Sequence, residues 1–108
     1  MAVEDTKHAS YRALVTRALE GDGRAAPARR RLAFDDGVED EPLKTLVRKV
    51  ARQPARITDA DIEAVKAAGL SEDEVFELVV CAALGQATRQ YESGLAALAE
   101  ASAGGESG

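Results

Sequence analysis

The stretch from Ala68 to Ala101, AGLSEDEVFELVVCAALGQATRQYESGLAALAEA, decides the fold of this chain. Between Val75 and Leu84 it is apolar at every position except Glu77. A helix that is apolar all round is surrounded by protein in the folded state. The stretch therefore predicts a long helix that needs cover on more than one side.

The helical period of about 100° per residue gives the apolar run two separate faces. The first face carries four aliphatic residues: Val75, Leu78, Val79 and Ala82. The second face carries one aromatic and three aliphatic residues: Phe76, Val80, Ala83 and Ala87. The rest of the chain predicts only short helices with one narrow apolar stripe each. These can cover one face comfortably, but covering both within one subunit would be difficult. We therefore expect a second copy of the chain to cover the other face.

Beyond Gly85 the pattern narrows to a single amphipathic stripe. Its members are Leu84, Ala87 or Thr88, Tyr91, Leu95 and Leu98. Gly85 and Gly94 each cost about 1 kcal/mol relative to alanine inside a helix, so we expect a kink or a close helix crossing there. We predict a homo-oligomer whose interface contains these residues of the long helix: Val75, Phe76, Val79, Val80, Ala83, Leu84, Tyr91 and Leu95.

The composition favours helix throughout. The chain has 108 residues, enough for one domain with a modest core. Hydrophobic residues make up 45 % of it, many of them are alanine, and strand formers never gather into an alternating run. We therefore predict an all-α fold, a small bundle of four to five helices.

Apolar spacing and turn residues predict how the chain is organised. Shorter helices are expected over 5–20, 42–53 and 59–68, before the long helix. The predicted organisation is a flexible N-terminus over 1–4, a single helical domain over 5–101 with an irregular connection over 21–41, and a disordered tail over 102–108.

Two capping boxes mark helix starts. Thr58 precedes Asp61 by three residues, and Ser71 precedes Glu74 in the same way. In a capping box the hydroxyl accepts from one backbone N–H while the acidic side chain accepts from the other. Gly69 lies between the two helices and can take the left-handed conformation that ends the first of them.

The net charge limits the partners. The formal net charge is −5, whereas nucleic acids and anionic membranes bind basic surfaces, so neither partner is expected. Arg29, Arg30 and Arg31 are a local exception that fits a solvated loop or a contact to an anion or a partner. The N-terminus lacks the pattern of a signal peptide and no apolar run is long enough to span a bilayer. A cytoplasmic location is therefore expected.

Residues that carry redox or metal chemistry are scarce. Cys81 is the only cysteine and His8 the only histidine, so no internal disulfide, Cys-x-x-Cys pair or zinc-ligand spacing exists. We predict no metal ion and no cofactor. On a buried helix, Cys81 is expected to be an inert core residue rather than a nucleophile. Glu77, one turn away, would raise the pKa of its thiol.

Three charged residues are the weak candidates for a catalytic or ligand-binding site: Glu77, Arg48 and Arg89. Glu77 on an apolar helix needs a partner, and Arg48 or Lys49 of a neighbouring helix is the expected one. Arg89 and Glu92 are three residues apart and can pair on the surface. These contacts are interpreted as structural salt bridges. The alternative is a pocket for a small acidic ligand at the helix crossing, anchored by Arg89 or Arg48.

The segment from Leu46 to Leu98 resembles the carboxymuconolactone decarboxylase and alkylhydroperoxidase D-like superfamily. The likeness lies in AAGLSEDEVFE, followed by the alanine-rich VVCAALG and the amphipathic ATRQYESGLAAL. The resemblance implies an all-helical fold and subunits that assemble into dimers, trimers or hexamers. Redox members carry a Glu, a Cys-x-x-Cys pair and a His before the AGL turn. Here that stretch, ARQPARITDADIEAVKAAG, has neither Cys nor His, so peroxide reduction by the thiol route is not expected, and the decarboxylase histidine has no counterpart either.

Two functional hypotheses follow. In the first, the chain is a non-redox member that acts as an oligomeric scaffold or binds a protein partner or small molecule. In the second, it is a decarboxylase-like enzyme on a small acidic or lactone-like substrate. A closed pocket lined by Arg48, Glu77 and Arg89 would favour the enzyme, and a dry seam of alanine, leucine and valine would favour the scaffold. The missing cysteines and histidine favour the scaffold.

Overall fold

The chain is all-helical, as the sequence predicts. A computed structural model describes residues 2–107, and the side chains of 9–103. Within that range there are no strands. The elements are α1 (Ala2–Glu20), α2 (Pro27–Phe34), α3 (Leu43–Arg52), the short 3₁₀ turn η1 (Pro54–Arg56), α4 (Asp59–Ala67) and α5 (Glu72–Ser107).

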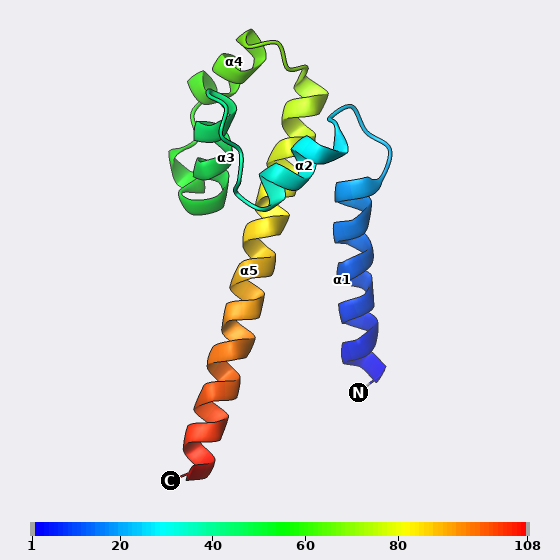
Figure 1. Cartoon of the computed structure of the whole chain (residues 1–108), viewed down its shortest axis with the longest axis vertical. Helices are drawn as coiled ribbons and strands as arrows, with labels where there is room; N and C mark the ends of the chain where they lie inside the picture. The colour runs from blue at the N-terminus through cyan, green and yellow to red at the C-terminus, as the bar shows by residue number, and fades with distance from the viewer. Residues whose placement is uncertain (1, 108) are drawn as a thin grey trace.

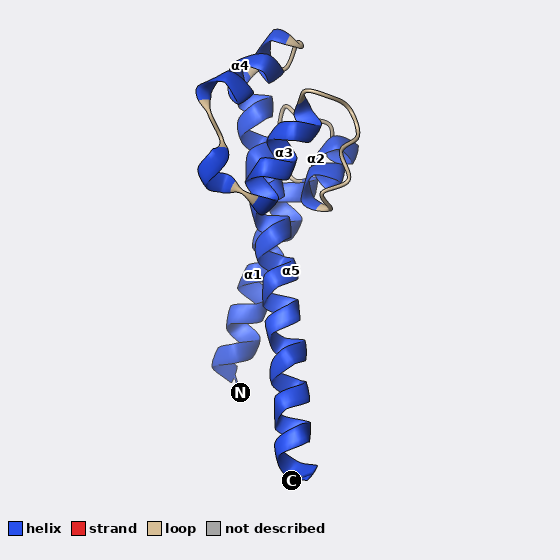
Figure 2. Cartoon of the chain, turned by 90° about the vertical axis from the view of Figure 1, so that its left-hand side faces the viewer, coloured by secondary structure: helices blue, strands red, loops and turns tan. Residues whose placement is uncertain are grey.

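The helices form a head and two projecting legs (Figures 1 and 2). We call α2, α3, α4 and residues 72–89 of α5 the head, and residues 90–107 the α5 leg. α1 runs back alongside α5 from the head and forms the second leg. The molecule measures 57 × 28 × 20 Å, and its radius of gyration is 16.8 Å. A compact chain of this length has a radius of gyration of about 13 Å, so a large part of the chain lies outside the core.

The core lies mainly in the head, and Leu19 of α1 together with Ala25 and Val38 of the connecting segments completes it. Its largest fully buried side chains come from α3, α4 and α5: Leu46, Val47, Val65, Leu78 and Cys81. α2 packs across α5 where Gly85 meets the end of α2, and a Cβ atom at position 85 would overlap the carbonyl oxygen of Phe34. Gly85 therefore marks a close helix crossing, one of the two expectations for it, and α5 continues through it without interruption.

Both predicted capping boxes are confirmed. Thr58 Oγ1 accepts from the Asp61 N–H at 3.3 Å, and the Asp61 carboxylate accepts from the Thr58 N–H at 2.8 Å. Ser71 and Glu74 make the same two contacts at 3.1 and 2.9 Å. Gly69 adopts φ +112°, a left-handed conformation that few side chains tolerate. These local signals fix where α4 and α5 begin.

The connection over 21–41, predicted to be irregular, contains a helix. Pro27 occupies the first turn of α2, where its missing N–H is not needed. Ala33 is completely buried against the core, and Phe34 packs against the core in part. The helix forms because packing against α5 supplies the stability that an eight-residue segment lacks on its own.

Arg30, in the same connection, is buried rather than solvated. The sequence offered the arginine run as a solvated loop or an anion contact, but Arg30 is only 4 % exposed. Its guanidinium donates to three backbone carbonyls, those of Ala18 at 3.1 Å, Gly21 at 2.8 Å and Ala25 at 3.1 Å. The buried cation thus satisfies two carbonyl groups at the end of α1, those of Ala18 and Gly21, and a third in the loop that follows.

The two chain ends are helical where the sequence predicted flexible residues. α1 begins at Ala2, within the segment 1–4, and α5 continues to Ser107, within the tail 102–108. Met1 and Gly108 lie outside the described residues. Extending an existing helix by one residue adds one hydrogen bond without a new nucleation cost, so the alanine-rich α5 propagates toward its end.

Candidate functional site

The inner face of α5 is buried in the head. Val75 is 4 % exposed, Leu78 and Ala82 are completely buried, and all three belong to the core cluster. Val75 was predicted to lie in an oligomer interface. That assignment is wrong, because the side chain is covered within its own subunit.

The outer face of α5 is open. Four large apolar side chains on it are exposed: Phe76 at 68 %, Tyr91 at 57 %, Leu95 at 49 % and Leu98 at 66 %. Ala83 and Ala87 are also exposed, whereas Val79, Val80 and Leu84 are half-buried. We call the row of Phe76, Val80, Ala83, Ala87, Tyr91, Leu95 and Leu98 the outer stripe. It follows one side of α5 for about 33 Å, at 1.5 Å per residue.

The α5 leg is exposed from Gln90 to Ser102. A Cβ atom added at Gly94 would meet nothing within 4 Å. Figures 1 and 2 both show the leg extending beyond the other helices. An amphipathic helix normally packs its apolar side against something, so the outer stripe is the outstanding feature of this surface.

Among the described side chains, α1 contacts α5 through Tyr11 and through residues nearer its C-terminal end. The Tyr11 hydroxyl lies 2.5 Å from Thr88 Oγ1 and donates more weakly to the Leu84 carbonyl at 3.4 Å. Near the C-terminal end of α1, the Ala18 carbonyl accepts from the Cys81 thiol at 3.5 Å. Nothing in the sequence indicates the polar contact between Tyr11 and Thr88, two residues 77 positions apart.

Glu77 holds the loop that follows α1. Its carboxylate accepts from the backbone N–H groups of Arg24 and Ala25, each at 2.9 Å. These two N–H groups hold the pKa of Glu77 below its ordinary value. The predicted partners were Arg48 or Lys49, and this is wrong: Lys49 instead pairs with Asp61 at 2.9 Å.

Arg89 binds the C-terminal end of α2. Its guanidinium donates to the Phe34 carbonyl at 2.7 Å and to the Gln86 side-chain oxygen at 3.3 Å. A cation at the C-terminal end of a helix is favourable because the helix dipole is negative there. Arg89 was expected to pair with Glu92, but the structure directs it to the end of α2.

The three candidate site residues are not brought together. Glu77 and Arg89 lie on the same helix about 18 Å apart, at 1.5 Å per residue. Arg48 is exposed on α3, and its charge helps to lower the pKa of Glu41, after the stronger effect of hydrogen bonds from Thr45. Glu77 and Arg89 are occupied by backbone partners. The arrangement offers no shared anchor for an acidic ligand.

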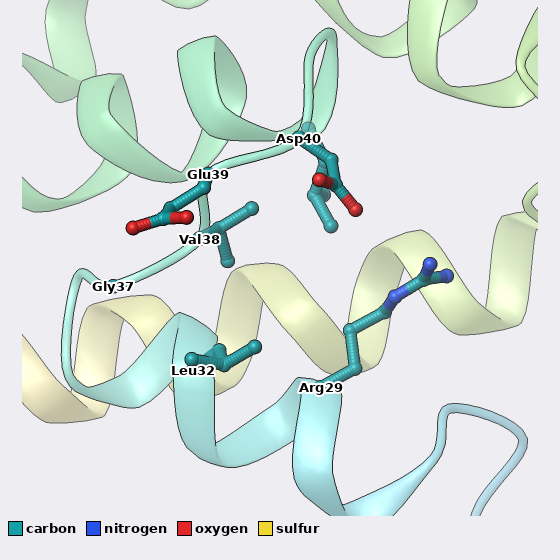
Figure 3. Close-up of a pocket in the computed structure, with 7 residues that line it drawn as sticks. Arg29, Leu32, Gly37, Val38, Glu39 and Asp40 are labelled. Atoms are coloured by element: carbon teal, nitrogen blue, oxygen red, sulfur yellow. The ribbon is translucent and has the colours of Figure 1, made fainter.

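A shallow hollow lies elsewhere, between α2 and the segment that leads to α3 (Figure 3). Its volume is about 350 Å³, at the small end for ligand sites. It is lined by Arg29, Leu32, Gly37, Val38, Glu39, Asp40 and Leu43. Both carboxylates are on exposed residues, so the hollow has no desolvated acid that would bind a ligand strongly.

Cys81 is part of the core. It is 1 % exposed, and burial raises the pKa of its thiol, opposed by the charge of Arg30 and reinforced by that of Glu77. The thiolate is the nucleophilic form, so this environment disfavours thiol chemistry. The direction of the Glu77 effect agrees with the sequence prediction.

The described part of the chain contains no group of three His, Cys, Asp or Glu residues that could hold a metal ion. The side chain of His8 lies outside the described residues. Across residues 2–107, no helix combines the length and apolarity needed to cross a membrane. Comparisons with protein-family models, curated proteins and solved structures give no match.

Proposed function

We propose that this chain is a non-redox helical scaffold that binds copies of itself through the outer stripe of α5. Its role is to hold its subunits, and any partner bound to them, in a fixed arrangement. The observation that supports the proposal is the exposure of Phe76, Tyr91, Leu95 and Leu98 along one side of α5.

The surface is large enough for such an assembly. A helix about 11 Å across that offers half its circumference over about 33 Å presents roughly 570 Å². Two such faces would bury about 1,100 Å² together, which exceeds the roughly 1,000 Å² that a specific interface needs. The chemistry is also suitable, since the stripe combines two aromatic residues with aliphatic ones and contains no charged residue.

We also propose that Leu46–Leu98 belongs to the carboxymuconolactone decarboxylase and alkylhydroperoxidase D-like superfamily, which it resembles in sequence. An all-helical fold agrees with that membership. A cytoplasmic setting and a second, protein or small-molecule ligand belong to the same proposal. We do not advance the decarboxylase-like alternative, because Glu77 and Arg89 are occupied by backbone groups, none of the three candidates lines the hollow beside α2, and Cys81 is buried.

Sedimentation of the full chain tests self-association. The expected result is a species of at least twice the subunit mass of 11.4 kDa at high concentration. Leu98→Glu places a charge in the outer stripe and should reduce the association constant at least about tenfold, since an unpaired charge in an apolar interface costs more than 1.4 kcal/mol.

Ala96→Glu is the matched control. It adds the same charge to the α5 leg, two residues away and about 160° from Leu98 around the helix. Both side chains are exposed, so neither change disturbs the head. A wild-type chain that remains a single subunit at every concentration would refute the proposal. Equal effects of the two variants would show that the outer stripe is not the contact.

A further inference from the structure

We infer that the partner on the outer stripe is a second copy of α5, packed antiparallel and centred on Ala87. The inference rests on the proposed function, and it specifies which residues of the two α5 helices face each other. In such a pair, a residue of one copy faces the residue of the second copy for which the two sequence numbers add up to 174. Ala87 then meets Ala87 of the second copy across a two-fold axis.

The side-chain sizes along the outer stripe fit this register. Phe76, near the head, would face Leu98, near the end of the leg. Ala83, a small residue, would face Tyr91, a large one. Val80 would face Gly94, whose missing side chain leaves space on the leg. In the pairs Ala83–Tyr91 and Val80–Gly94, a small residue opposite a larger one lets two apolar surfaces interdigitate at the density of a protein interior.

The charges of α5 favour antiparallel over parallel packing. The first turn of α5 carries three acids: Glu72, Asp73 and Glu74. A parallel pair would place both acidic turns side by side, which is unfavourable for like charges. The antiparallel pair places Glu72 and Asp73 opposite Ser102 and Ala101, and it also opposes the two helix dipoles.

The same arrangement explains why the α5 leg is long and bare. The leg of one copy would lie along the open face of the other copy's head, where Phe76 is exposed. Each leg thus covers the apolar surface that its partner cannot cover itself. The contact is isologous, so it closes as a dimer and leaves no stripe exposed for further addition.

Disulfide trapping with single cysteines tests the register. Cys81 is first replaced by serine, and circular dichroism confirms that the Cys81→Ser chain remains folded. In this background Ala87→Cys should form a covalent dimer with itself, because its two Cα atoms lie within reach of a disulfide. A mixture of Ala83→Cys and Tyr91→Cys chains should cross-link at least about tenfold faster than either chain alone, by its higher effective concentration. Ala96→Cys, off the stripe, is the control and should not cross-link.

The outcomes separate the register from self-association itself. If sedimentation shows dimers but Ala83→Cys cross-links to itself as fast as the mixture does, the pair is parallel and the inference is overturned. Dimers that cross-link through Ala96→Cys would overturn the choice of face. A single subunit by sedimentation, with no cross-linking at any position, would overturn the proposed function as well.

Discussion

The two halves of α5 place similar residues in opposite surroundings. In the head, Leu78 is completely buried and Gly85 meets the backbone of another helix. In the α5 leg, Leu98 is 66 % exposed and Gly94 meets nothing. One continuous helix therefore belongs half to a core and half to a surface. The comparison teaches that the apolar content of a helix predicts how much cover it needs, but not which molecule supplies the cover.

The largest expected difference between the halves is the cost of removing a leucine. Leu78→Ala should lower the free energy of unfolding by about 2–5 kcal/mol, because it leaves a cavity in a packed core. Leu98→Ala should change it by less than about 0.5 kcal/mol in the single subunit. Urea unfolding, performed on dilute protein to avoid association, measures both. Similar losses would contradict the division of α5 into a buried half and an open half.

The two glycines should respond to alanine with opposite signs. Gly85→Ala forces a methyl group into the Phe34 carbonyl and should cost about 1–3 kcal/mol. Gly94→Ala has open space around it and should stabilise the helix by about 1 kcal/mol. Thermal unfolding of the two variants shows the sign directly. A stabilising Gly85→Ala would mean that α2 does not cross α5 as closely as described.

Glu77→Gln tests the charged contact that holds the loop after α1. Hydrogen bonds to a charged acceptor exceed neutral ones by about 1 kcal/mol, so a loss of about that size is expected near neutral pH. Because the folded-state pKa of Glu77 is lowered, its ionised form stabilises the fold above the ordinary carboxyl range. That contribution is lost as the pH falls through the folded-state pKa, so wild type and variant should converge in acid.

The control for Glu77 is Glu92→Gln, which removes a carboxylate from the exposed leg. Its effect on the free energy of unfolding should stay within about 0.5 kcal/mol. A pH-independent gap between wild type and Glu77→Gln would contradict the role given to the charge of Glu77.

An effect of similar size is expected at the cap of α5. Ser71→Ala removes the hydroxyl that accepts from the Glu74 N–H at 3.1 Å and should cost about 1 kcal/mol. Ser93→Ala, an exposed serine in the same helix, is the control and should be slightly stabilising because alanine is the better helix former. Equal responses would mean that the cap does not hold the start of α5.

Local features of the fold could be predicted from the sequence. The capping boxes at Thr58 and Ser71 depend on residues three positions apart, so the sequence contains the whole interaction. The helical spacing of apolar residues likewise assigned Leu78 and Phe76 to two different faces of α5. The structure buries the first within the head and leaves the second open.

Contacts between distant segments could not be predicted. Glu77 is bound by backbone N–H groups of Arg24 and Ala25, and every sequence has such groups. The short helix α2 has weak signals of its own and depends on packing against Gly85. Gly85 and Gly94 look alike in the sequence, and only the position of α2 separates their roles. The candidate charged site failed for the same reason, since Glu77 and Arg89 bind backbone groups of distant segments rather than each other.

Hydrogen exchange along α5 at two protein concentrations tests the central claim most directly. An apolar helix half without its own cover should exchange almost as fast as an isolated helix in dilute solution. We predict that the amides of 94–101 become protected at high concentration in the wild type and remain unprotected in Leu98→Glu, while those of 75–85 are protected throughout. If the amides of 94–101 are protected equally in the single subunit, or remain unprotected at the highest concentration, no second copy covers the stripe and the account is wrong.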